Sequence, residues 1–250
     1  MSDAIRVGLV GFGYASKTFH APLIGGTPGM ALKAVASSDA DKVHADWPGV
    51  KVMSAPGDLL DDPDIDLVVI ATPNDTHFPL AKAALEAGKH VVVDKPFTVT
   101  LSQARELESL AKHCGRILSV FHNRRWDSDF LTVSALINEG QLGEVCYFES
   151  HFDRFRPQVR QRWREQAGPG SGIWYDLAPH LLDQVVVLFG LPVSITVDLA
   201  QLRPGAQSTD YFHAVLAYPQ RRVVLHGTLL AAAESARFIV HGSRASYIKY

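Results

Sequence analysis

The sequence predicts an α/β protein that begins with a doubly wound parallel sheet and continues into an α+β domain with a mostly antiparallel open sheet. Three observations support this prediction. Apolar runs alternate with helical patterns over residues 1–122. The first run, residues 5–10, has no polar face, which is typical of a strand buried on both sides, and it leads directly into Gly11 and Gly13. After residue 193, strand-like runs follow one another through short links.

The first part of the chain is expected to hold the parallel strands and their connecting helices. Residues 100–114 are the clearest helix, because Thr100 and Gln103 fit a capping box and Gly115 stands at the end. Ligands of such sheets bind beyond the carboxyl ends of the strands, so the loops there should line one crevice. Strands are expected at 5–10, 31–38, 51–54, 65–72, 90–94 and 116–121, and further helices near 14–24, 41–47 and 80–87.

The pattern changes after His122, which predicts a domain boundary at that point. Residues 1–122 are expected to form a dinucleotide-binding domain, and residues 123–250 a domain for substrate binding and dimerisation. In the second domain, helices are expected at 130–137 and 174–189, an arginine-rich loop at 154–166, and strands at 144–153, 193–200, 211–218, 221–230, 237–240 and 246–250.

Two of these strands suggest self-association. The pattern of residues 211–218 and 221–230 is apolar on both alternating faces. On the strand before them, by contrast, Ser194, Thr196 and Asp198 indicate a face exposed to solvent. A strand of an antiparallel sheet that is apolar on both faces needs two coverings. One covering is the domain's own helices, and the other is expected to be a second copy packed sheet to sheet, in a homodimer or larger homo-oligomer.

Composition limits the function classes. The 250 residues are 47% hydrophobic and 20% charged with a formal net charge of −2, so there is no electrostatic case for nucleic acid or a membrane surface. No apolar run is long enough to span a bilayer, and no signal-peptide layout opens the chain, so a cytoplasmic location is expected. Cys114 and Cys146 belong to no CxxC or Cys/His cluster, so no disulfide framework or metal site is expected.

The turn after the first strand is the predicted phosphate site. A first glycine permits the turn, a second lets the backbone approach a pyrophosphate, and the following helix N-terminus favours negative charge. Ser16 stands at the third small position of the fingerprint. The alternative is a plain strand-to-helix turn. The predicted cofactor contacts here are Gly11, Phe12, Gly13, Tyr14 and Ala15.

The end of the second strand bears on cofactor choice. An NAD enzyme usually places a carboxylate there to accept hydrogen bonds from the ribose 2′-hydroxyl. Here Ser37 and Ser38 end the strand, and Lys42 could supply a cation to a 2′-phosphate. These three residues are expected to bind the cofactor, and they favour NADP over NAD. A shift of one residue would place Asp39 at the ribose and restore a preference for NAD.

Asp94, Lys95 and Pro96 follow a buried strand and are expected to face the crevice. Asp94 and Lys95 would contact the cofactor, and the Lys95 ammonium could also stabilise alkoxide character on a substrate oxygen during hydride transfer. Pro96 opens the option of a cis Lys95–Pro96 bond. The alternative is a lysine that only caps the strand and pairs with Asp94.

A second candidate for chemistry lies in residues 172–180. Pro179 fits best in a first helical turn, which would place Asp176 at the helix start and His180 one turn further on the same face. A carboxylate beside an imidazole can tune the histidine for proton transfer near neutral pH. The alternative is that Asp176 only caps the helix.

Two further loops have an ambiguous pattern. The segment from Thr72 to His77 could line the cofactor site or simply cap the next helix. The arginine-rich loop could be a solvated face, or it could bring Arg164 to a cofactor phosphate and Trp163 over the nicotinamide. The cofactor contacts predicted from these loops are Thr72, Pro73, Asn74, His77, Trp163 and Arg164.

Taken together, these motifs resemble the Gfo/Idh/MocA oxidoreductase family over the whole chain. The resemblance rests on the early GFG, Thr72-Pro73-Asn74 with His77, Asp94-Lys95-Pro96, Asn123-Arg124, Gly140 to Glu144, and Gly172 through Asp176, His180 and Asp183. It implies an N-terminal Rossmann domain, with Asn123 among the cofactor contacts. It also implies that Lys95 and His180 are the catalytic pair, assisted by Asp176. The similarity is greatest to members that act on scyllo-inositol and its ketone.

Two features depart from the family pattern. The lysine motif usually begins with Glu where this chain has Asp94, and members continue beyond residue 250, so the chain is expected to be a fragment. Three functions remain open: an NAD(P)-dependent oxidoreductase for a cyclic polyol or sugar, a dinucleotide-binding sensor without turnover, and a redox-neutral NAD-using glycosidase. The catalytic residues favour the first.

Overall fold

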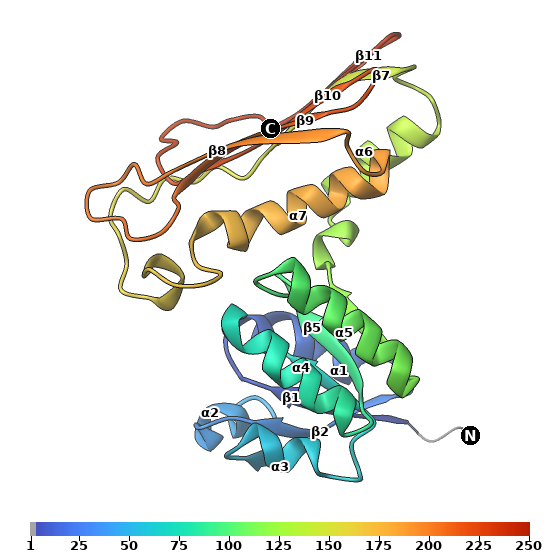
Figure 1. Cartoon of the computed structure of the whole chain (residues 1–250), viewed down its shortest axis with the longest axis vertical. Coiled ribbons are helices and arrows are strands. Elements are labelled where there is room, and N and C mark those ends of the chain that lie inside the picture. The colour runs from blue at the N-terminus through green and yellow to red at the C-terminus, as the bar shows by residue number, and fades with distance from the viewer. Residues whose placement is uncertain (1–3) are drawn as a thin grey trace. The chain divides into compact units, whose positions relative to one another are not determined.

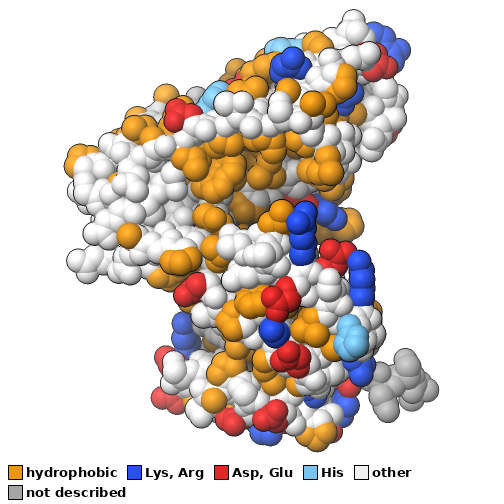
Figure 2. All heavy atoms as spheres, in the orientation of Figure 1, with side chains coloured by type: hydrophobic (Ala, Val, Ile, Leu, Met, Phe, Trp, Pro, Cys, Tyr) orange, Lys and Arg blue, Asp and Glu red, His pale blue; other side chains and the backbone are white. Residues whose placement is uncertain are grey.

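The computed structural model describes residues 4–250, and the chain divides into two compact units after Phe121 (Figure 1). Within the described residues, no helix is both long and apolar enough to cross a membrane. On the first unit, acidic and basic side chains are interspersed over the face that Figure 2 shows.

The first unit is built on a six-stranded sheet in the order β3-β2-β1-β4-β5-β6, in which all neighbours are parallel. This confirms the predicted doubly wound sheet, in the strand order of dinucleotide-binding domains. The switch point lies between β1 and β4, because the chain runs outward in both directions from there. The strands are β1 (Ile5–Val10), β2 (Met30–Ala36), β3 (Lys51–Met53), β4 (Leu67–Ile70), β5 (His90–Asp94) and β6 (Leu118–Phe121).

Both faces of this sheet are buried, as the apolar runs predict. Val68 packs with one apolar cluster and the next residue, Val69, with another, and neither is more than 3% exposed. The Thr100–Gln103 capping box and the left-handed Gly115 are present at the ends of α5. The helices are η1 (Ser16–His20, a π-helical segment), α1 (Ala21–Gly26), α2 (Ala40–His44), α3 (Pro56–Leu60), η2 (Asn74–Thr76), α4 (His77–Glu86) and α5 (Leu101–Cys114).

The second unit has a six-stranded sheet in the order β12-β11-β7-β10-β9-β8. Helices α6 and α7 cover one face of it (Figure 1). Only the central pair β7 and β10 is parallel, which confirms the mostly antiparallel sheet. The elements are η3 (Asn123–Trp126), α6 (Ser128–Asn138), β7 (Val145–His151), η4 (Trp163–Glu165), α7 (Gly172–Phe189), β8 (Ser194–Ala200), β9 (Tyr211–Ala217), β10 (Arg222–Thr228), β11 (Phe238–Gly242) and β12 (Ser246–Lys249).

One core fills the space between this sheet and α7. Phe148, Phe212 and Leu225 come from three strands and pack with Leu181 of α7, and all four are fully buried. The opposite face, called here the free face, carries the alternate residues of the same strands. The prediction that residues 211–218 and 221–230 are apolar on both faces is wrong, because His213 and His226 stand on the free face. The edge strand β8 is exposed along most of its length.

Candidate functional site

The glycine turn follows β1 at the switch point of the first sheet. Gly11 has φ +88°, and its amide donates to the Ala36 carbonyl at 2.9 Å. A Cβ atom at Gly11 would lie 2.8 Å from the Ala71 carbonyl oxygen. Both the positive φ and the close approach to the neighbouring strand therefore require glycine at this position.

Gly13 differs from Gly11 because it faces open space. A Cβ atom at Gly13 would meet no protein atom within 4 Å, and no positive φ requires glycine there. A helical segment starts at Tyr14, directly after Gly13, and the first amides of a helix lack intrahelical partners. A glycine that the protein's own packing does not need fits the close approach of a pyrophosphate. The residues of this turn thus suit a dinucleotide.

Of the other residues at the turn, Phe12 and Ser16 are buried beneath it, and Tyr14 and Ala15 lie at its surface. The Phe12 side chain is buried in an apolar cluster, so only its backbone is available to a ligand. Ser16 is fully buried, and its hydroxyl donates to the Gly11 carbonyl at 2.8 Å. Tyr14 is 78% exposed and Ala15 is half-buried.

The loop after β2 places the residues that bear on cofactor choice. Ser37 is half-buried, its amide donates to the Met53 carbonyl at 2.9 Å, and its hydroxyl oxygen accepts from the Asp39 amide at 3.2 Å. Ser38 and Lys42 are exposed. Asp39 caps α2, because its Oδ1 accepts from the Lys42 amide at 3.0 Å. One oxygen of the carboxylate that could have favoured NAD is therefore engaged within the helix cap.

The loops after β4 and β5 are joined through His77. The imidazole ring of His77 is buried. Its Nδ1 lies 2.8 Å from the Pro96 carbonyl oxygen, and its Nε2 lies 3.0 Å from the Thr72 carbonyl oxygen. His77 was predicted as a cofactor contact, and the structure places it between two backbone carbonyls that it holds in position. Asn74 is also buried, whereas Thr72 is half-buried and Pro73 is exposed.

Asp94 is oriented by its neighbours at the end of β5. Its Oδ1 accepts from the Lys95 amide at 2.7 Å, and its Oδ2 lies 3.7 Å from Nε2 of the buried His20. Burial alone would raise the pKa of Asp94, but His20 and Lys95 more than offset this and hold it below its ordinary value. His20 was not predicted, because it belongs to no motif of the sequence and reaches Asp94 only in the folded chain. The Lys95–Pro96 bond is cis, the option that the sequence left open.

Helix α7 carries Asp176 and His180 one turn apart, but the predicted helix start is wrong. The helix begins at Gly172, so Pro179 lies inside it and Asp176 lies in its second turn. The N-cap is Ser171, which excludes the alternative that Asp176 only caps the helix. His180 is 6% exposed, and its ring packs edge-to-face with Phe152.

The arginine-rich loop brings Arg164 to Asp176 and stacks it on Trp163. Arg164 Nε lies 3.4 Å from Asp176 Oδ1, and the Arg164 guanidinium stands 4.3 Å from the centre of the Trp163 ring. Asp176 therefore pairs with a cation from this loop, which the spacing within 172–180 could not indicate. Asn123 is half-buried in η3, two residues after β6.

A buried ion network secures the same loop. Arg203 donates to Asp210 at 2.9 Å and lies 3.1 Å from Glu165, and all three residues are at most 5% exposed. Glu165 also accepts from the Arg160 amide and from Arg162 Nε. The network anchors Glu165 of this loop while Arg160 stays exposed, so the alternative of a solvated basic face holds for only part of the loop. The sequence held no signal for the network, because Arg203 and Asp210 lie in a different connection.

Comparisons with known proteins agree with this arrangement. A model described as "Oxidoreductase family, NAD-binding Rossmann fold" matches residues 5–122. A second, described as "Oxidoreductase family, C-terminal alpha/beta domain", matches residues 134–250. Together they account for nearly the whole chain, so the first unit is an NAD(P)-binding domain.

Individual relatives span more than this chain. The chain is 80% identical over 250 residues to the uncharacterized oxidoreductase YdgJ of Escherichia coli (strain K12), covering 100% of this chain and 72% of that protein. It is 38% identical over 248 residues to scyllo-inositol 2-dehydrogenase (NADP(+)) IolW of Bacillus subtilis (strain 168), covering 99% of this chain and 69% of that protein. The structure of a putative oxidoreductase from Yersinia pestis matches with a TM-score of 0.94 and 70% identity, covering 100% of this chain and 71% of that one.

Proposed function

The chain belongs to the Gfo/Idh/MocA oxidoreductase family, and from this premise we propose that it transfers a hydride between NADP and a cyclic polyol or sugar of the inositol or inosose type. The observation that carries the proposal is the turn at the switch point, where packing requires Gly11 to be glycine and leaves Gly13 open to a ligand. Similarity to IolW, named as an NADP-dependent scyllo-inositol dehydrogenase, supports the substrate class.

In this proposal, two side chains do the acid–base and electrostatic work. A bound nicotinamide supplies or accepts the hydride. The His180 imidazole takes the proton of the substrate hydroxyl during oxidation and returns it during reduction. The Lys95 ammonium stabilises the negative charge that develops on the same oxygen. Asp176 orients His180 or a neighbouring substrate hydroxyl, and Arg164 holds the Asp176 carboxylate in place.

The proposed preference for NADP rests on the loop after β2. Ser38 is exposed, can donate to a phosphate oxygen and carries no opposing charge, and the exposed Lys42 of α2 could supply a cation. Asp39 is engaged as the cap of α2, which supports Ser38 as the residue nearest the ribose. The cofactor in the name of IolW, NADP(+), supports the same choice.

A substrate screen tests the proposal. Inositols, inososes, sugars and simple ketones are incubated with each nicotinamide cofactor and followed by nicotinamide absorbance. We expect turnover with at least one cyclic polyol or its ketone. Tight cofactor binding without any absorbance change would contradict the proposal and favour a sensor. Release of sugar from a glycoside without net absorbance change would contradict it in favour of a redox-neutral glycosidase.

We also propose that two copies associate through the free face of the second sheet. Tyr211, Val215 and Val224 lie on this face, and apolar side chains there would be covered by a second sheet. The histidines among them make the surface more polar than the sequence pattern indicates. Sedimentation equilibrium of the purified protein is expected to give a dimer mass, and a concentration-independent monomer mass would contradict the proposal.

A further inference from the structure

Three potential metal ligands meet on the free face of the second sheet. His151 ends β7, and Asp153 stands two residues later, where the chain still runs extended beside β10. Residues two apart on an extended chain face the same side. His226 of β10 lies directly opposite His151 in the parallel register. Strand register alone therefore brings the three side chains together.

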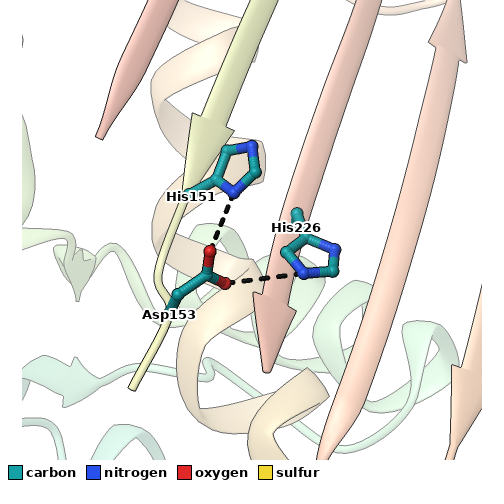
Figure 3. Close-up of side chains that lie close together, drawn as sticks. All are labelled: His151, Asp153 and His226. Carbon is teal, nitrogen blue, oxygen red and sulfur yellow. Dashed lines mark hydrogen bonds and ion pairs between the residues drawn. The ribbon is translucent and has the colours of Figure 1, made fainter. Parts of the chain in front are cut away.

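The distances suit a small cation. Asp153 Oδ2 lies 2.9 Å from His151 Nδ1, and Asp153 Oδ1 lies 3.6 Å from His226 Nε2 (Figure 3). One ligand atom from each residue lies within 4.8 Å of the others. Zinc binds nitrogen and carboxylate oxygen at about 2.0–2.2 Å in a tetrahedral arrangement, which places neighbouring ligand atoms roughly 3.3 Å apart. Small side-chain rotations would bring the ligand atoms to this spacing.

A second observation points to an ion. Among the described residues, Asp153 Oδ1 and His226 Nδ1 are buried side-chain atoms without a hydrogen-bond partner, and the Asp153 side chain is only 10% exposed. A buried carboxylate oxygen without a hydrogen bond is costly. A cation between Asp153 and His226 would compensate Oδ1 directly.

The surrounding residues hold the ligands in a suitable state. Glu149 Oε1 lies 2.5 Å from His151 Nε2, and the Tyr147 hydroxyl donates to the other oxygen of Glu149. The Ser235 hydroxyl donates to Asp153 Oδ2 at 2.6 Å. A carboxylate behind a ligating histidine fixes the ring tautomer and increases its basicity as a ligand.

An open cavity of about 660 Å³ gives access to the cluster. His151 and Asp153 contribute to its wall together with Glu234 and Arg237. Both ring nitrogens of His151 lie within hydrogen-bond distance of carboxylate oxygens. A cation that enters would replace the Nδ1 proton, which leaves to solvent.

We propose that His151, Asp153 and His226 bind one Zn²⁺ ion, with the remaining coordination position filled by water or another donor. Two imidazoles and a carboxylate are a ligand set that zinc accepts, and the site would clamp the only parallel strand pair of this sheet. The proposal is independent of the oxidoreductase function, because none of its ligands takes part in the proposed catalysis.

Zinc titration of untagged, chelator-stripped protein tests the site. A chromophoric chelator of known affinity competes for the ion, and far-UV circular dichroism checks the fold of each variant. We expect one equivalent of Zn²⁺ per chain in the wild type. Asp153→Asn and His226→Gln should each weaken binding at least about tenfold, since loss of even an outer-shell partner typically costs 10- to 100-fold. His241→Gln is the matched control, because His241 of β11 lies on the same free face of the sheet, opposite Tyr147 of β7.

Histidine modification gives a readout on the wild-type protein alone, at a protein concentration where sedimentation shows the monomer, because the proposed dimer would cover the same face. Diethyl pyrocarbonate labelling, followed by peptide mass spectrometry, is expected to slow at His151 and His226 when Zn²⁺ is added and to stay unchanged at His241. Wild-type protein without one tight equivalent, variants that bind as the wild type does, or labelling that zinc leaves unchanged would each overturn the proposal.

Discussion

The Ser16 hydroxyl donates a hydrogen bond to the Gly11 carbonyl at 2.8 Å, so the first helical segment secures the turn that it follows. Ser16 stands where dinucleotide-binding fingerprints usually have Gly or Ala. Its side chain is fully buried, and the hydrogen bond satisfies the hydroxyl without using space outside the turn. The open side of the turn, at Gly13, therefore remains available to a ligand.

The first prediction separates ligand binding from folding at this turn. Gly13→Ala should leave the melting temperature nearly unchanged, because the added methyl group meets no protein atom within 4 Å. The same methyl group should obstruct the pyrophosphate and weaken NADPH binding at least about tenfold, or about 1.4 kcal/mol. Fluorescence titration with NADPH and a thermal melt measure the two effects.

Two other glycines serve as controls for this prediction. Gly11→Ala should lower the melting temperature as well, because of φ +88° and the Ala71 carbonyl oxygen 2.8 Å away. Gly26→Ala, in open space at the end of α1, should change neither measurement. Unchanged NADPH affinity in Gly13→Ala would show that the pyrophosphate binds elsewhere.

The second prediction concerns catalysis. His180→Ala should lower kcat by about 10²- to 10⁴-fold, since a positioned acid–base group is lost. Lys95→Ala should lower kcat by about 10²- to 10³-fold through loss of one electrostatic donor. Cofactor affinity, measured by fluorescence, should stay within a few fold in His180→Ala. Near wild-type turnover in either variant would exclude that residue from its proposed role.

The third prediction concerns cofactor choice. Ser38→Asp should shift the ratio of kcat/KM values towards NAD, because the new carboxylate accepts from the ribose 2′-hydroxyl and repels a 2′-phosphate. The comparison needs both cofactors on one substrate. Asp39→Asn is the control. Its ratio of kcat/KM values for the two cofactors should equal that of the wild type, because the Asp39 side chain caps α2. A wild-type preference for NAD that disappears in Asp39→Asn would reverse the assignment.

The fourth prediction concerns the buried ion network. Arg203→Ala leaves the carboxylates of Glu165 and Asp210 buried without their shared cation, and breaking such a network costs about 3–5 kcal/mol. Urea unfolding should show this loss in the second unit. The exposed Arg160 contacts Glu165 through its backbone amide, so Arg160→Ala should stay within about 0.5 kcal/mol. Equal effects of the two substitutions would contradict the assigned role.

The fifth prediction concerns the opposite titration of His151 and His226 in metal-free protein. Burial would lower the pKa of His151, but hydrogen bonds and charges of Asp153 and Glu149 prevail and raise it. Burial lowers the pKa of His226, and the nearby His151 and His213 add to this effect against Asp153 and Glu149. NMR titration of the ring protons should therefore give the higher pKa to His151.

The two shifts have opposite consequences for stability. The contribution of His151 is fully present below the unfolded pKa of about 6.5 and is lost as pH rises through its higher folded value. The contribution of His226 is present above the unfolded pKa and is lost as pH falls through its lower folded value. Asp153→Asn should lower the pKa of His151, and a raised or unchanged value would contradict the network.

The features that the sequence predicted correctly are set by residues close together along the chain. Periodicity in residues 5–10 and 65–72 predicts strands buried on both faces, because side-chain alternation is a local property. The capping box of Thr100 with Gln103 and the turn at Gly11 are equally local. Pro179 misled the same reasoning, since a proline usually starts a helix, and here packing of α7 against the sheet tolerates it inside.

Features built from distant segments required the folded chain. Sequence spacing indicates no metal site at His151, Asp153 and His226, because 73 residues separate Asp153 from His226 and only the register of β7 with β10 joins them. Arg203 meets Glu165 for the same reason, through the path of two connections rather than any motif. Local patterns thus predicted the strands, the longer helices and the glycine turn, but not α3. Strand order and register, which depend on packing of the whole chain, decided which polar side chains meet.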